Sequence, residues 1–111
     1  MTEQEQHEQR RSPRRAVRWK AAIKDGDNVI PAKTVNVSEH GVLLETEVNF
    51  KMRQIIPVMI QANNNSKSLT VYARAQVRHV VIRTVNFHIG LQFTEIQPEA
   101  QKFIALFAEG G

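Results

Sequence analysis

Two short polar segments carry most of the side chains that could do chemistry in this sequence. The first is RRSPRR at residues 10–15, and the second is NVSEHG at residues 36–41. A guanidinium donates two parallel hydrogen bonds to a phosphate, and its flat face stacks on a base. Asn and Ser side chains bond a base edge or a phosphate oxygen. The two segments together therefore predict a site for an anionic nucleotide.

The second segment has a spacing that suits such a site. Asn36 and Ser38 are two residues apart, so on an extended strand they face the same side. Gly41 can take the positive φ that other residues resist, and it presents no Cβ to a flat ligand. We therefore expect a strand that ends in a turn at Gly41, with both polar side chains on one face.

The positive charge of the chain is concentrated near its start. The formal net charge is +4, and residues 10–24 hold seven of the fifteen Lys and Arg residues and no acid. Such a cluster favours a phosphate-bearing partner, which is a nucleotide, a nucleic acid or an anionic lipid surface. A solvated basic tail is the alternative interpretation.

Other kinds of chemistry find little support. The chain has no cysteine, and its four histidines show no metal-ligand spacing, so we expect no metal site. Ser38 lacks the Gly-x-Ser-x-Gly elbow of a nucleophile, and no acid–base pair is visible, so we expect no enzyme. The first nine residues are polar and no long apolar run follows. We therefore expect no secretory signal, no membrane insertion and a cytoplasmic location.

The elements that must position these residues follow from the apolar pattern. Residues 1–9 read as a disordered polar tail, and residues 10–109 as a single domain. Trp19 alternates with other apolar residues and is expected in the core. Alternation and β-branched residues predict strands over 17–24, 29–37, 42–47, 55–62, 69–83 and 87–94, the fifth bent or interrupted.

The period changes near the end of the chain. Apolar residues from Ala100 to Ala108 recur at the spacing of one helical face, with Pro98 at the start and Gly110 at the stop. We therefore predict a mainly all-β fold, a six-stranded antiparallel β-barrel with a C-terminal α-helix and a flexible N-terminal tail. The helix would pack on the barrel or cover one of its mouths.

In this order, the two polar segments resemble the hallmark of the PilZ domain family, whose bacterial members bind the second messenger cyclic di-GMP. That hallmark is Arg-x-x-x-Arg before the first strand, followed later by [Asp/Asn]-x-Ser-x-x-Gly. The GLQF run at residues 90–93 and the helix after it extend the resemblance, which covers residues 8–109.

The resemblance implies a barrel without catalysis and assigns roles to the matching residues. Arg10 and Arg14 would grip phosphates and stack on guanine, while Asn36 and Ser38 would bind a guanine edge and its surroundings. Gly41 would shape the turn.

Three further arginines are candidate ligand contacts. Arg11 and Arg15 form a second Arg-x-x-x-Arg pair, shifted by one residue. We prefer the pair Arg10 and Arg14, because members of the family often carry another arginine directly after the first. Arg78, on a middle strand, is a candidate from its approximate position, and a solvated strand residue is the alternative interpretation.

The resemblance also implies how the protein acts. We expect a stand-alone cyclic di-GMP receptor without an effector domain, which needs no cofactor beyond the ligand. Its N-terminal segment and surface would change on binding and signal to an unidentified downstream protein. One alternative is a small basic barrel that binds single-stranded nucleic acid, although one Trp, one Tyr and five Phe offer few stacking platforms. The other is an interaction module of the same fold that binds no nucleotide, against which the intact polar motifs argue.

Overall fold

The computed structural model describes residues 12–110, so the predictions for the tail, Arg10 and Arg11 lie outside the described residues. No helix in this described part is long and apolar enough to cross a membrane. Its elements are β1 (Arg15–Ala16), β2 (Lys20–Asp25), β3 (Asn28–Ser38), β4 (Gly41–Thr46), β5 (Ile55–Asn64), β6 (Lys67–Ile82), β7 (Phe87–Ile96) and α2 (Pro98–Ala108).

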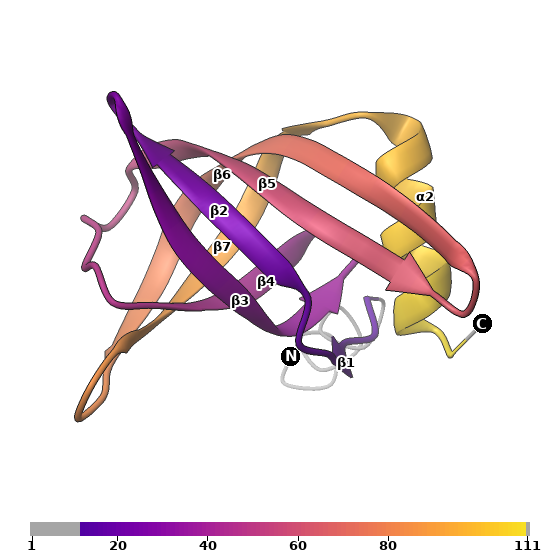
Figure 1. Ribbon diagram of the computed structural model, residues 1–111, viewed down its shortest axis with the longest axis horizontal. Helices are drawn as coiled ribbons and strands as arrows, with labels where there is room; N and C mark the ends of the chain where they lie inside the picture. The colour runs from indigo at the N-terminus through magenta and orange to yellow at the C-terminus, as the bar shows by residue number, and fades with distance from the viewer. Residues whose placement is uncertain (1–11, 111) are drawn as a thin grey trace, which may run out of the picture.

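Six of these strands close into an antiparallel barrel, in the order β3-β2-β5-β6-β7-β4, and β4 returns to pair with β3. The short strand β1 pairs with β3 at Val37 and Asn36. Figure 1 shows α2 at one end of the barrel, on the same side as the chain termini of the described part. The predicted barrel with its C-terminal helix is confirmed.

The core fills the inside of the barrel because alternate residues of each strand face inward. Trp19 is 3% exposed, which confirms its predicted place in the core. The helix turns Ile104 and Phe107 toward the same cluster, so α2 is held by burial of its apolar face. The largest fully buried apolar side chains on the strands are Ile23, Val37, Leu44, Ile56, Ile60, Val71, Val77 and Ile89.

The first strand differs from its prediction. Residues 17–24 were expected as one strand, whereas β2 begins only at Lys20 and β1 is a separate piece. The cause is Thr34, a fully buried side chain whose Oγ1 accepts a 2.7 Å hydrogen bond from Trp19 N and donates to Val17 O. Thr34 thus replaces part of the backbone ladder, and the β3–β4 register shifts between Thr34 and Asn36. This break separates β1 from β2 in the chain.

The predicted bent strand is β6, whose pairing with β7 shifts register at two places. One shift lies between Val77 and His79, so Arg78 is the extra residue of a β-bulge. The loop before β5 supports this bulge, because Arg53 N donates to Val77 O at 2.8 Å and Val77 N donates to Gln54 O at 2.9 Å. A bulge redirects the side chain that it carries, and here that side chain is Arg78.

Candidate ligand-binding site

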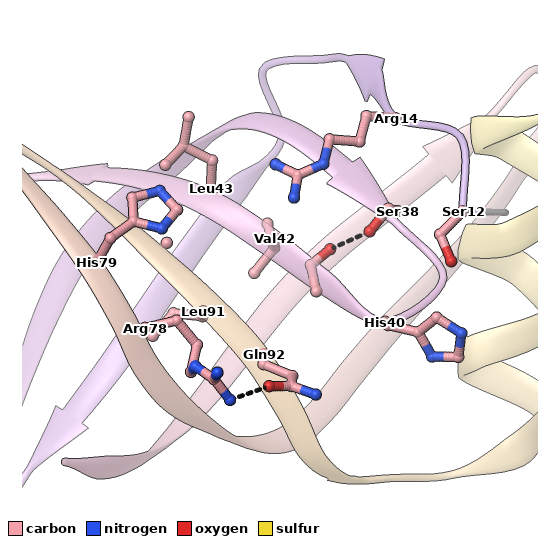
Figure 2. Close-up of a pocket in the computed structure, with 12 residues that line it drawn as sticks. Ser12, Arg14, Ser38, His40, Val42, Leu43, Arg78, His79, Leu91 and Gln92 are labelled. Carbon is pink, nitrogen blue, oxygen red and sulfur yellow. Dashed lines mark hydrogen bonds between the residues drawn. The ribbon is translucent and has the colours of Figure 1, made fainter. Parts of the chain in front are cut away.

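A pocket of about 610 Å³ lies where β4 and the bulge of β6 meet β7, with the segment before β1 at its rim. Figure 2 shows Arg14 and Arg78 on either side of Val42 in this pocket. Of the described residues, those lining it include no Asp or Glu. They are Ser12, Arg14, Ser38, His40, Gly41, Val42, Leu43, Arg78, His79, Gly90, Leu91 and Gln92.

The two arginines are placed by different means. Arg14 directly precedes β1, and the pairing of β1 with β3 brings it to the pocket. Arg78 stands on the β6 bulge and donates a 2.6 Å hydrogen bond to Gln92 Oε1, drawn dashed in Figure 2. Because Gln92 is neutral, this bond orients the guanidinium without compensating its charge. The pocket therefore offers two cationic groups, with Arg78 already held in place.

Ser38 and Gly41 close the turn from β3 to β4. Ser38 is 6% exposed, and its Oγ donates a 3.3 Å hydrogen bond to Gly41 O. Gly41 does not adopt a positive φ, because only Gly26 and Gly110 do so among the described glycines, which corrects the expectation from sequence. A Cβ at position 41 would instead overlap the carbonyl oxygen of Leu91. Close approach of β4 to β7 is therefore what requires glycine here.

Asn36 is beside the pocket but does not line it. It is half-buried on β3, two residues before Ser38, and its partner across the β3–β4 pair is Leu43, a lining residue. Cross-strand partners project to the same face of a sheet, so the side chains of Asn36 and Leu43 lie on the same face.

Arg15 is directed elsewhere. Its Nη1 donates a 2.9 Å hydrogen bond to Phe107 O in the last turn of α2, and its guanidinium carbon lies 4.2 Å from the centroid of the Phe107 ring. It is not among the lining residues. The structure thus brings together Arg14, Ser38, Gly41 and Arg78, with Asn36 adjacent, and holds Arg15 against the helix.

Sequence reasoning did not identify Leu43 or His79 as lining residues of the pocket. Leu43, half-buried on β4, adds an apolar side chain to the lining, whereas the side chains of Val42 and Leu91 are each 4% exposed and belong to the core. His79 lines one side, and its ring lies where a Cβ on Gly90 would have to go. The GLQF run at residues 90–93 belongs to the family pattern, but its contribution of lining residues depends on the pairing between β6 and β7.

The carboxylate of Glu45 lies outside the pocket lining and has its own partner. Arg18 Nη1 donates a 3.0 Å hydrogen bond to Glu45 Oε1, and this bond lowers the pKa of the Glu45 carboxyl. Arg18 itself is thereby engaged on the barrel surface. Among the described residues no group of three His, Cys, Asp or Glu side chains could hold a metal ion.

A small closed antiparallel barrel with one C-terminal helix defines the class of fold, a small β-barrel domain. The sequence matches the family model described as PilZ domain over residues 8–109. The chain belongs to the PilZ domain family. No curated protein matches it.

Several solved structures share the fold. MotI/DgrA, the inhibitor of motility from Bacillus subtilis, is matched with a TM-score of 0.83 at 15% identity, over 91% of this chain and 50% of that chain. YcgR from Escherichia coli in complex with c-di-GMP is matched with a TM-score of 0.72 at 13% identity, over 91% and 45%. The PilZ domain of YcgR with c-di-GMP gives a TM-score of 0.72 at 11% identity, over 91% and 89%.

This chain spans about half the length of MotI/DgrA and of the YcgR chain in the first complex. At identities of 11–15%, these likenesses show the fold.

Proposed function

We propose that the protein is a receptor for cyclic di-GMP that acts in the cytoplasm by binding rather than catalysis. The observation that carries this proposal is the pocket, in which Arg14, Ser38, Gly41 and Arg78 converge without a lining acid among the described residues. Membership of the PilZ family supports it, since PilZ domains are typically non-catalytic receptors. The fold it shares with YcgR, which is solved in complex with c-di-GMP, supports it further.

The pocket chemistry suits a cyclic dinucleotide. The ligand carries two anionic phosphates and two flat bases, and the site offers two guanidiniums and the apolar side chain of Leu43. In this proposal Arg14 binds a phosphate. Arg10, which lies outside the described residues, binds a phosphate as well. Ser38 and Asn36 bond a guanine edge.

The proposal also assigns roles to Arg78, Arg11 and Gly41. Arg78 contributes a charge-assisted or stacking contact, since its orientation by Gln92 leaves its charge available. Arg11 is a further contact in the N-terminal segment. Gly41 allows β4 to lie close to β7 beside the pocket.

Ligand binding would then change the N-terminal segment. Phosphates neutralise the mutual repulsion of the arginines at residues 10–15, which favours one arrangement of that segment over the pocket. A protein partner would then recognise and bind the altered surface. The support for this step is the placement of Arg14 at the rim of the pocket, directly before β1.

Isothermal titration calorimetry with cyclic di-GMP, beside GTP and the linear dinucleotide, tests the function. We expect binding of the cyclic dinucleotide only, and a loss of about tenfold to a hundredfold in affinity for Arg14→Ala, since a charge-assisted bond is worth about 1.5–3 kcal/mol. Ser38→Ala removes a neutral hydrogen bond, worth about 0.5–1.5 kcal/mol, so its loss of affinity should reach at most about tenfold. Lys24→Ala on the exposed side of β2 is the matched control for lost charge. No heat with cyclic di-GMP, or equal affinity for GTP, would overturn the proposal.

A further inference from the structure

Arg15 joins the short strand β1 to the end of the helix. Its Nη1 donates to Phe107 O at 2.9 Å, and its guanidinium lies over the Phe107 ring at 4.2 Å. The same ring packs against Trp19, with ring centroids 4.7 Å apart and planes tilted by 46°. We call Arg15, Trp19 and Phe107 the Arg15 clamp.

The clamp is chemically favourable at both of its contacts. The carbonyl end of a helix carries a partial negative charge, and α2 has no basic residue in its last turn. Arg15 supplies that cation from another element. The face of Phe107, itself 6% exposed, attracts the same guanidinium through a cation–π interaction. Two independent contacts thus fix the direction of one side chain.

The direction of Arg15 bears on its neighbour Arg14. Adjacent side chains of an extended chain project to opposite sides, and here Arg15 reaches the helix while Arg14 lines the pocket. β1 is only two residues long, with Arg15 opposite Val37 and Ala16 opposite Asn36. So short a strand has little ladder to hold it, and the clamp is the side-chain anchor at this place.

We propose that Arg15 is a positioning residue of the ligand site, which acts through Arg14 and does not touch the ligand. By anchoring β1 to α2, it keeps Arg14 directed into the pocket before the ligand arrives. A ligand-binding group held in advance loses less entropy on binding, so the clamp raises affinity for the anionic nucleotide. This inference rests on the proposed function and separates the two overlapping arginine pairs, since Arg14 binds and Arg15 anchors.

The first test needs no ligand. The chain has no cysteine, so Ser12→Cys gives a unique attachment point for a nitroxide spin label two residues before Arg14. In the electron paramagnetic resonance spectrum of the ligand-free protein, we expect Arg15→Ala to narrow the lines of the label. Narrower lines report greater motion of this segment. Arg14→Ala should leave them unchanged. Identical spectra for Arg15→Ala and the parent would overturn the anchoring role, whether or not cyclic di-GMP binds.

The second test distinguishes anchoring from direct contact. Cyclic di-GMP is titrated into wild type, Arg14→Ala, Arg15→Ala and Lys24→Ala at several salt concentrations. We expect Arg15→Ala to weaken binding about tenfold. The affinity of Arg15→Ala should depend on salt concentration as the affinity of Lys24→Ala does, because both variants lose one positive charge. The affinity of Arg14→Ala should depend less on salt concentration, because a phosphate contact is gone.

The outcomes separate this inference from the proposed function. Arg15→Ala with wild-type affinity, or with salt dependence as flat as that of Arg14→Ala, would overturn the positioning role. A wild-type protein that binds no cyclic di-GMP would overturn the proposed function, and the spin-label result would then decide the anchoring alone. The single tryptophan, Trp19, packs on Phe107, so its emission checks that each variant keeps the rest of the clamp.

Discussion

Gly41 on β4 lies so close to Leu91 on β7 that a Cβ at position 41 would overlap the Leu91 carbonyl oxygen. The glycine of the second polar motif is therefore required by barrel closure, independently of any ligand. We expect Gly41→Ala to destabilise the fold by about 1–3 kcal/mol, because the obstacle is backbone and cannot rotate away. Urea unfolding followed by circular dichroism measures this loss.

Gly26→Asn is the control for that experiment. Gly26 has φ +62° in the β2–β3 turn and open space around it, and Asn tolerates this conformation. Its unfolding midpoint should stay close to wild type. A Gly41→Ala protein as stable as Gly26→Asn would contradict the role of Gly41 in closure.

Arg78 is expected to contribute to ligand affinity through the orientation that Gln92 gives it. Arg78→Ala should weaken cyclic di-GMP binding about tenfold, since it removes a charge-assisted contact. Gln92→Ala should weaken it less, because the guanidinium remains but its 2.6 Å hydrogen bond to Gln92 Oε1 is lost. Calorimetry measures both, with Arg74→Ala on the exposed face of β6 as the control. Arg78→Ala and Arg74→Ala of equal affinity would contradict this contribution.

We expect Thr34 to contribute to the stability of the fold, although its hydroxyl makes it more polar than the other buried residues. Thr34→Val keeps the shape but leaves the buried N–H of Trp19 without its 2.7 Å acceptor. We expect a loss of about 1–3 kcal/mol in the free energy of unfolding. Thr70→Val, on the exposed face of β6, should change stability little. Thermal unfolding of the two variants checks the difference, and equal midpoints would show that the Thr34 hydroxyl is dispensable.

The ion pair of Arg18 and Glu45 predicts a dependence of stability on pH. Its hydrogen bond lowers the pKa of Glu45 in the folded protein, so the folded state binds fewer protons than the unfolded state near that pKa. The stabilisation is complete above the pKa of an unfolded Glu, about 4.3, and is lost as the pH falls through the lower folded value.

Arg18→Gln should raise the Glu45 pKa, measured by NMR titration of its carboxyl carbon. Wild type and variant should then differ in stability at neutral pH and converge in acid. Arg74→Gln removes the cation of another surface pair, Arg74 and Glu95 at 3.8 Å, and should leave the Glu45 titration unchanged. An unaltered Glu45 titration in Arg18→Gln would contradict the assigned cause.

Local sequence patterns were enough to predict the barrel, the helix and the core position of Trp19, because strand alternation and helical periodicity are properties of each element's own sequence. They were not enough for the break before β2. That break depends on the Thr34 hydroxyl, which meets Trp19 and Val17 only after β2 and β3 pair.

The same limit explains what was found of the site. Arg14 and Ser38 were recognisable by residue type and motif, and the pocket contains both. The lining by Leu43 and His79 and the orientation of Arg78 depend on register across strands, including a one-residue bulge, which no local pattern displays. The reason for Gly41 was mistaken because the nearest atom, the Leu91 carbonyl oxygen, belongs to a strand fifty residues further along the chain.

The pairing of β4 with β7 has a kinetic consequence. It joins Gly41 to Gln92 and Thr46 to Phe87, a greater distance along the chain than any other strand pair of the barrel spans. Contacts between distant segments form late, because the entropy of closing the loop must be met first. The pocket is built on this pairing, so a chain whose hairpins have formed but whose barrel is still open has no site. The rate at which ligand binding appears during refolding would therefore measure the rate of barrel closure.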